Sequence, residues 1–199
     1  LDLLKDAGAI DSPYQFHFKR FLFEHFPKGS GFPALEAPPI KDELAVASVQ
    51  AFSIDDSMTT EIDDALSVQG LGTGVVTYGV HIAAPSLAIA PGSPMDVVGR
   101  ARMSTVYMPG HKITMLPDEV VQTYTLQEGR DCPAVSLYVS FDEATLEIKG
   151  SETKIERVPI AANLRHDKLD GVITEATLTG EAPADYAFAK ELAFAFRLA

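Results

Sequence analysis

The chain has 199 residues, 46% of them hydrophobic, and a formal net charge of −12 at pH 7. This length and composition suit one domain, or one domain with a fragment of another, and they exclude global disorder. The acidity argues against a simple nucleic-acid-binding module, because such modules usually offer a basic face to phosphates.

Residues 1–43 are expected to form a short helical segment and a linker, the tail of an accessory domain. Apolar residues at helical spacing run through residues 1–26, and Ser12 before Pro13 is typical of the start of a second helix. Because this helix is rich in phenylalanine, its spacing favours packing on a core. Residues 27–43 are rich in proline and glycine and predict a linker, with a domain boundary near residue 40.

The second domain, residues 44–199, begins with a pattern typical of strands. Residues 45–54, 65–68 and 75–83 are the candidates, since β-branched and aromatic residues are enriched there. A glycine-bearing turn joins the last two as a hairpin. A strongly acidic stretch between the first two strands is therefore expected in a loop held by a sheet, a common place for catalytic groups.

The remainder mixes helices and strands. A serine–proline start predicts a helix over residues 93–106, and strands are predicted over 134–141 and 146–158. Residues 166–172 predict a short helix. The helical pattern of residues 181–199 runs to the last residue without a stop signal, so we expect part of a longer polypeptide. The predicted fold is α+β, with a mixed or antiparallel sheet flanked by helices.

Cys132 is the only cysteine of the chain. An intrachain disulfide and a cysteine-rich zinc cluster are therefore excluded, and a reducing compartment such as the cytoplasm is expected. The sequence shows no signal segment and no apolar run long enough to span a bilayer, so we expect no membrane partner.

The acidic stretch is the most informative feature of the sequence. It contains five carboxylates and no basic residue, namely Asp55, Asp56, Glu61, Asp63 and Asp64. No Lys or Arg occurs between Lys41 and Arg100 to neutralise it. Carboxylates this crowded repel one another, and some must take up protons unless a cation bridges them. The stretch predicts a divalent metal site; taken alone, it leaves a solvated acidic loop as the alternative.

A site of oxygen ligands favours Mg²⁺ or Mn²⁺ first and Ca²⁺ next. The helix–loop–helix calcium motif, counted from Asp55, requires Gly at its sixth place and Glu at its twelfth. The chain has Thr60 and Leu66 there, so this motif is excluded. Because Mg²⁺ shares its open positions with substrate phosphates, the loop favours hydrolysis of a phosphodiester.

Three motifs, in this order, resemble the ribonuclease II family, often called the RNB family. They are the acidic stretch Asp55–Leu66, the triplet His81-Ile82-Ala83, and residues 102–117 with Tyr-Met-Pro-Gly and Met-Leu-Pro. The resemblance runs from about residue 45 to the end. It implies the N-terminal portion of the catalytic domain of a processive, hydrolytic exoribonuclease. Such an enzyme degrades single-stranded RNA from the 3′ end to 5′-mononucleotides and needs Mg²⁺, with Mn²⁺ as a possible substitute.

The resemblance also implies catalytic roles for individual residues. Asp55, Asp63 and Asp64 match the family's catalytic aspartates, and Glu61 stands where the family commonly has another Asp. We expect Asp55 and Asp64, with Glu61, to be the metal ligands, and Asp63 to position the attacking water or the terminal ribose hydroxyls. Tyr107 matches a tyrosine near the terminal nucleotide, where its ring can stack on a base. Without the resemblance, Tyr107 is an ordinary aromatic at a helix end.

Basic and histidine residues give weaker signals. Arg102 is a candidate for contact with an RNA phosphate, or simply covers the surface of its helix. His111 and Lys112 are further candidates for contact with the RNA backbone. His81, on a predicted strand, is expected to be a core histidine with its hydrogen bonds satisfied.

The chain departs from the family in two respects. Ala84 stands where the family often has an Asp, and the later half of the family's domain cannot be assigned within the 199 residues. That half brings a second aromatic, an arginine at the scissile phosphate and further acids. Without them, we expect the 199 residues alone to hydrolyse RNA weakly or not at all. Two alternatives stay open: a non-catalytic RNA-binding relative, and a metal-dependent phosphoesterase acting on another substrate.

Overall fold

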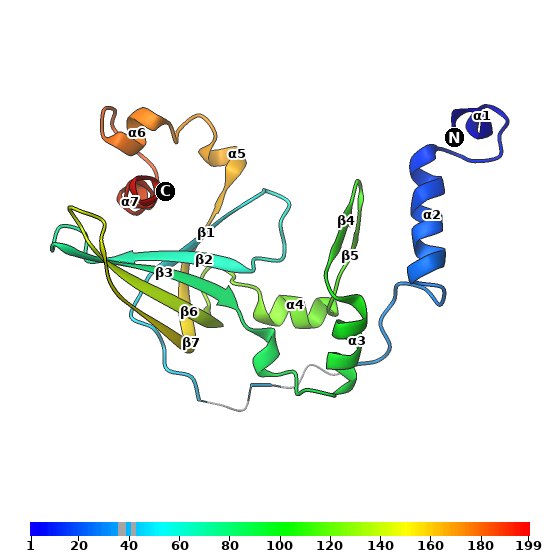
Figure 1. Cartoon of the computed structure of the whole chain (residues 1–199), viewed down its shortest axis with the longest axis horizontal. Coiled ribbons are helices and arrows are strands. Elements are labelled where there is room, and N and C mark those ends of the chain that lie inside the picture. The colour runs from blue at the N-terminus through cyan, green and yellow to red at the C-terminus, as the bar shows by residue number, and fades with distance from the viewer. Residues whose placement is uncertain (36–38, 41–42) are drawn as a thin grey trace.

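The computed structural model describes residues 1–35, 39–40 and 43–199. Five strands close into a barrel, and helices flank it, so the fold is α+β as the sequence predicts (Figure 1). Five residues of the linker predicted over 27–43, namely 36–38 and 41–42, lie outside the described part.

The barrel has the strand order β1-β2-β3-β6-β7. All neighbouring strands are antiparallel except β1 and β7, which close the barrel as a parallel pair. The strands are β1 (Ala51–Asp55), β2 (Asp64–Gln69), β3 (Val75–Ala83), β6 (Asp131–Asp142) and β7 (Ile148–Arg165). The predicted hairpin of β2 and β3 is confirmed.

The first strand is shorter than predicted. Ala47 and Val49 are buried, and the segment 45–50 makes only an isolated bridge, between Val46 and Arg157. Its apolar residues therefore reflect burial in the core, and the segment does not pair with a neighbour as a regular strand. In contrast, β7 extends seven residues beyond the predicted end at residue 158, to Arg165.

Two helices, α1 (Asp2–Asp6) and α2 (Pro13–His25), form the N-terminal segment. The predicted start is confirmed, because the Ser12 side chain accepts a hydrogen bond from the backbone N–H of Gln15. The expected packing of α2 on a core is wrong, since none of its residues is buried. Instead α2 touches the rest of the chain at a few points, including a hydrogen bond from the Tyr14 hydroxyl to the Pro109 carbonyl.

A second group of elements lies between the barrel and α2 in Figure 1. It contains η1 (Pro85–Leu87), α3 (Pro94–Arg102), the short hairpin β4 (Val106–Met108) and β5 (His111–Ile113), and α4 (Asp118–Tyr124). The hairpin and α4 were not predicted. The helix predicted over residues 93–106 ends at Arg102, because Met103 has a positive φ of 65° that leaves the helical path.

Three helices follow β7 and lie above the barrel in Figure 1: α5 (His166–Leu169), α6 (Glu175–Thr179) and α7 (Ala189–Leu198). The helix predicted over residues 181–199 is shorter, and it begins after Phe188, which has a positive φ of 59° and stacks its ring on Phe52. Among the described residues, no helix combines the length and hydrophobicity that crossing a bilayer requires.

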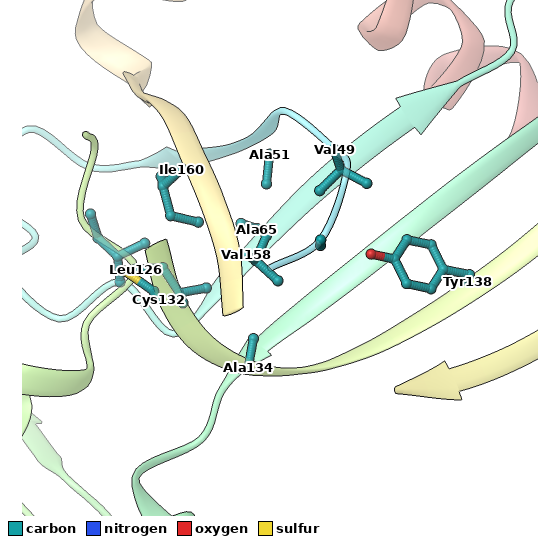
Figure 2. Close-up of a cluster of buried hydrophobic side chains, with 11 residues drawn as sticks. Val49, Ala51, Ala65, Leu126, Cys132, Ala134, Tyr138, Val158 and Ile160 are labelled. Carbon is teal, nitrogen blue, oxygen red and sulfur yellow. The ribbon is translucent and has the colours of Figure 1, made fainter. Parts of the chain in front are cut away.

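The main core lies inside the barrel and is built largely from small side chains (Figure 2). Its members alternate along the strands, as β structure requires. They are Ala47, Val49, Ala51, Ile62, Ala65, Leu126, Cys132, Ala134, Tyr138, Val158 and Ile160. Ile62 belongs to the acidic stretch and Leu126 follows α4, so this core also fixes the backbone around the acids.

A buried polar cluster lies on three adjacent strands of the barrel. His81 is fully buried and hydrogen-bonds through its two ring nitrogens to the hydroxyls of Ser136 (2.8 Å) and Ser67 (2.9 Å). A Cβ on Gly79 would clash with the Ser67 hydroxyl and press against the His81 ring, so glycine is needed beside the ring. The prediction of a satisfied core histidine is confirmed.

Burial of His81 makes stability depend on pH. Loss of water lowers the pKa of His81 to about 4, from 6.5, although Glu156 opposes the shift. Its contribution to stability is therefore complete above pH 6.5 and is lost as pH falls towards 4, because the unfolded chain then binds the extra proton. We expect this to cost up to about 3 kcal/mol of the free energy of unfolding. His81→Gln, compared with the wild type by urea unfolding from pH 7 to 4, should lose that pH dependence. If the free energy of unfolding changed equally with pH in both proteins, the prediction would be contradicted.

Candidate active site

The acidic stretch forms the loop between β1 and β2, as predicted, with Asp55 ending β1 and Asp64 beginning β2. Its backbone is held at several points. The N–H of Ile62 donates to the Thr125 hydroxyl (2.8 Å), and the Ile62 carbonyl accepts from the N–H of Leu126 (2.9 Å). The carbonyl of Asp63 accepts from the N–H of Ala83 (2.8 Å). The loop is thus attached both to β3 and to the segment after α4.

Two residues of the barrel support the beginning of the loop. The Ser53 hydroxyl donates to Oδ2 of Asp55 at 2.6 Å. Arg165, at the end of β7, donates to the carbonyls of Asp56 (2.9 Å) and Thr59 (3.2 Å). Its cationic group therefore lies at the loop backbone, where its positive charge lowers the local negative potential.

Asp63 carries the electrostatic signature of the loop. Its pKa is raised, first because neighbouring protein atoms displace part of its water, and then because Glu61, Asp64 and Asp55 are like charges nearby; Lys112 opposes the shift. The side chain remains exposed. A cation bound beside this accessible carboxylate would relieve the repulsion between the like charges.

Glu61 is bound to the β4–β5 hairpin. Lys112 of β5 forms an ion pair with its Oε1 (3.1 Å), and the Tyr107 hydroxyl of β4 donates to its Oε2 (3.1 Å). The Glu61 side chain is only 8% exposed. Both of its oxygens thus have partners in the hairpin, and its role as a metal ligand stays a prediction.

Tyr107 projects from β4 with 68% of its surface exposed. Loss of water and the nearby negative charge of Glu61 raise the pKa of its hydroxyl. The ring borders a groove of about 600 Å³ between the acidic loop and the hairpin, which Met58, His111 and Lys112 also line. An exposed ring held beside the acids through its hydroxyl leaves its faces available for stacking.

A smaller cavity of about 190 Å³ lies on another side of Glu61 and Asp63. Its walls are mostly apolar and come from η1, the segment after β5, and α4. Met115, Leu116 and Val120 are among them. Glu61 therefore borders both the groove and the cavity, whereas Asp63 borders the cavity.

Arg102 is used within the structure. Its guanidinium donates to the carbonyls of Thr114 (2.9 Å), Ser30 (2.7 Å) and Gly31 (2.9 Å) and lies 3.6 Å from the ring centroid of Phe32. It ties the segment after α2 to α3. Contact of Arg102 with RNA stays a prediction that would require part of this arrangement to open.

The acidic loop offers hard oxygen donors without a closed cage. Within the described residues, no group of three or more His, Cys, Asp or Glu side chains is arranged to hold a metal. Mg²⁺ needs no such cage, because it is usually bound by one or two carboxylates together with water and substrate phosphates. Asp55 and Asp64 therefore fit the ion by their chemistry.

Comparison with known proteins matches residues 45–198 to the RNB domain, which accounts for the barrel, the acidic loop, the hairpin and the C-terminal helices. The chain belongs to the RNB family. An uncharacterized ribonuclease of Synechocystis sp. is 33% identical over 106 residues, which are 53% of this chain and 16% of that protein. Exoribonuclease 2 of Serratia proteamaculans is 41% identical over 68 residues, 34% of this chain and 11% of that protein.

Solved structures show the same RNB fold. RNase R of Mycoplasma genitalium, in complex with ribose-methylated single-stranded RNA, matches with a TM-score of 0.64 and 21% identity over 90% of this chain and 27% of that one. Yeast Ssd1, a pseudonuclease, matches with a TM-score of 0.68 and 21% identity over 84% of this chain and 20% of that one. The chain thus spans a small part of its relatives, and the RNB fold occurs in both nucleases and a pseudonuclease.

The sequence interpretation missed several supporting residues of this RNB domain. Ser53 stands two positions before Asp55 on a strand, and this spacing could have placed both side chains on one face. Asn163, whose side-chain amide donates to the Ser53 hydroxyl (3.0 Å), and Arg165 gave no such signal, since only closure of the barrel brings β7 to the loop. Lys112 was noted as a candidate for RNA contact, but its pairing with Glu61 was not predicted.

Proposed function

We propose that this RNB-family chain is part of a hydrolytic exoribonuclease that degrades single-stranded RNA from the 3′ end to 5′-mononucleotides and depends on Mg²⁺, or on Mn²⁺ in its place. The observation that carries the proposal is the RNB-domain match, which includes the acidic loop with all three expected aspartates in place. One relative that the chain matches is exoribonuclease 2 of Serratia proteamaculans.

The proposed roles follow from the geometry of the loop. Asp55 and Asp64 would hold the cation, which when bound would offset negative charge at the scissile phosphate. Asp63, accessible and close to both, would position the attacking water or the terminal ribose hydroxyls. Tyr107 would stack on a terminal base, a contact that tolerates any sequence because every base has a π-face.

RNA is the proposed polymer because the family and the site point to it together. RNase R of Mycoplasma genitalium has been solved with single-stranded and with double-stranded RNA. In this chain the groove beside Tyr107 is open, and Lys112 and His111 line it together with residues of the acidic loop. A cation on the loop would reverse its repulsion of phosphates despite the net charge of −12.

The test of the proposal uses the complete natural polypeptide and single-stranded RNA labelled at its 5′ end, with Mg²⁺ or with a chelator. We expect stepwise shortening from the 3′ end and release of 5′-mononucleotides, both lost with the chelator. RNA that is retained intact, while a known exoribonuclease degrades it under the same conditions, would contradict the proposal.

A non-catalytic RNA-binding relative is the second candidate. It is favoured by the likeness to the pseudonuclease Ssd1 and by two departures in the sequence. Glu61 stands where the family commonly has an Asp, and its carboxylate is paired with Lys112 of the hairpin. Ala84 stands where the family often has another Asp, and it is buried at 2% exposure. RNA binding without turnover would support this candidate. Turnover of small phosphate esters without RNA degradation would instead indicate a phosphoesterase with another substrate.

Tyr107 provides a prediction about substrate affinity. Tyr107→Ala should raise the KM for RNA about 10- to 100-fold, because stacking on one base contributes about 1–3 kcal/mol. Tyr107→Phe is the matched control, since it keeps the ring and removes only the hydrogen bond to Glu61. Steady-state kinetics of both variants decide the role: equal KM values for the two would show that the ring does not stack on RNA.

A further inference from the structure

Strand β7 closes the barrel against β1, and its last residues face the start of the acidic loop. Ser53 pairs with Asn163 across this parallel seam, and Asp55 pairs with Arg165. The side chains of Ser53 and Asp55 share one face of β1, because alternate residues of a strand point the same way. The seam therefore brings residues from 110 positions later in the sequence to the first acid of the loop.

A β-bulge in β7 decides which side chain meets Ser53. Ala51 pairs with Ile160, but its neighbour Phe52 pairs with Ala162, so one residue of β7 is extra. An extra residue reverses the alternation of side chains beyond it, and bulges are known to redirect side chains near functional sites. The bulge thus brings the side chain of Asn163 into register with the serine.

The hydrogen bonds of Asn163 fix the direction of its amide. Its Oδ1 accepts from the N–H of Glu128 (2.8 Å), so this atom is the oxygen. Its Nδ2 donates to the Ser53 hydroxyl (3.0 Å) and to the Leu126 carbonyl (2.9 Å). Because Oγ of Ser53 receives this hydrogen, its own proton is directed to Oδ2 of Asp55 (2.6 Å). Ser53 is only 2% exposed, so water competes little for these bonds.

We propose that Asn163 and Ser53 are positioning residues for Asp55, acting as a hydrogen-bond relay that holds its carboxylate in one orientation. Oδ2 is occupied by the serine proton, which leaves Oδ1 as the oxygen to face a ligand. The effect of the relay on cation binding and turnover rests on the proposed function, whereas its hydrogen bonds do not. Groups that orient a ligating carboxylate typically change metal affinity or activity by about 10- to 100-fold when they are removed.

The first test compares Ser53→Ala with Ser140→Ala in the complete natural polypeptide. Ser140 is a matched control, because its hydroxyl also hydrogen-bonds a side chain of the barrel, the hydroxyl of Thr77 (3.0 Å), but it lies near the C-terminal end of β6, away from the acidic loop. We expect Ser53→Ala to weaken Mn²⁺ binding in a calorimetric titration by about 10- to 100-fold and to lower kcat with little change in KM. Ser53→Thr, which keeps the hydroxyl, should restore both, and Ser140→Ala should change neither. Equal metal affinity and kcat in Ser53→Ala and Ser140→Ala would overturn the relay.

The second test does not depend on catalysis. Ser53→Ala, Asp55→Ala and the double variant form a cycle of unfolding free energies. If the serine donates to the aspartate, the stability lost through Ser53→Ala should shrink when Asp55 is already absent. Additive effects would refute the relay even in an active enzyme. If the wild type shows neither metal uptake nor turnover, the proposed function fails, and this cycle still decides the relay.

Discussion

Asp63→Asn is expected to abolish release of mononucleotides from RNA and to leave RNA binding nearly unchanged. The amide keeps the size of the side chain but cannot take up a proton from water or hold its hydrogen bonds in the same way. Loss of a group that positions or accepts a proton typically costs about 10²- to 10⁴-fold in turnover. Single-turnover assays with end-labelled RNA measure the loss, and filter binding measures the retained affinity.

The variant should not lose stability. The pKa of Asp63 is raised by loss of water and by Glu61, Asp64 and Asp55, so folding makes its charged form less favourable than it is in the unfolded chain. The cost of holding the charge therefore appears as pH rises through the folded pKa, and a neutral amide removes it at pH 7. Asp56→Asn is the matched control, since this exposed neighbour is expected to be solvated. If Asp63→Asn kept its turnover, the role assigned to Asp63 would be wrong.

Asp64→Asn should produce the second large effect, a loss of both cation binding and turnover. An amide oxygen carries no full charge, so the hard cation loses one of its two proposed anionic ligands. We expect a loss of metal affinity larger than the about 10- to 100-fold expected for a supporting residue, with partial recovery of turnover at high Mn²⁺. Calorimetry and metal-dependent kinetics measure the two quantities.

Glu61→Gln tests whether Glu61 binds the metal directly or only supports the β4–β5 hairpin. Both Glu61 oxygens are bound by Lys112 and Tyr107, so its removal should weaken metal binding less than Asp64→Asn does. Gln keeps an oxygen that can accept from the Tyr107 hydroxyl and loses only the charge that pairs with Lys112, so the KM for RNA should change less than in Tyr107→Ala. A loss of metal affinity equal to that of Asp64→Asn would make Glu61 a direct ligand and reverse this assignment.

Local patterns in the sequence predicted much of the fold. The Ser12 cap, the β2–β3 hairpin and the buried His81 follow from capping residues, glycine turns and strand alternation, each of which acts over a few residues. The acidic loop was placed correctly for the same reason, because strands on its two sides have clear patterns.

Features that depend on distant contacts were not predictable. The parallel pairing of β1 with β7 joins segments more than 100 residues apart, and its bulge has no signature in the sequence. The β4–β5 hairpin has only three residues in each strand, too few for a periodic pattern. The aromatic face of α2 predicted a buried helix, but helical spacing does not specify which partner covers it.

The central claim is that the carboxylates of the loop hold a divalent cation at the end of an RNA chain. The most direct measurement is a calorimetric titration of Mn²⁺ into the complete natural polypeptide loaded with RNA, beside the Asp55→Ala/Asp64→Ala double variant. The account predicts saturable uptake by the wild type that the double variant lacks. No uptake by the wild type, or equal uptake by both proteins, would contradict it.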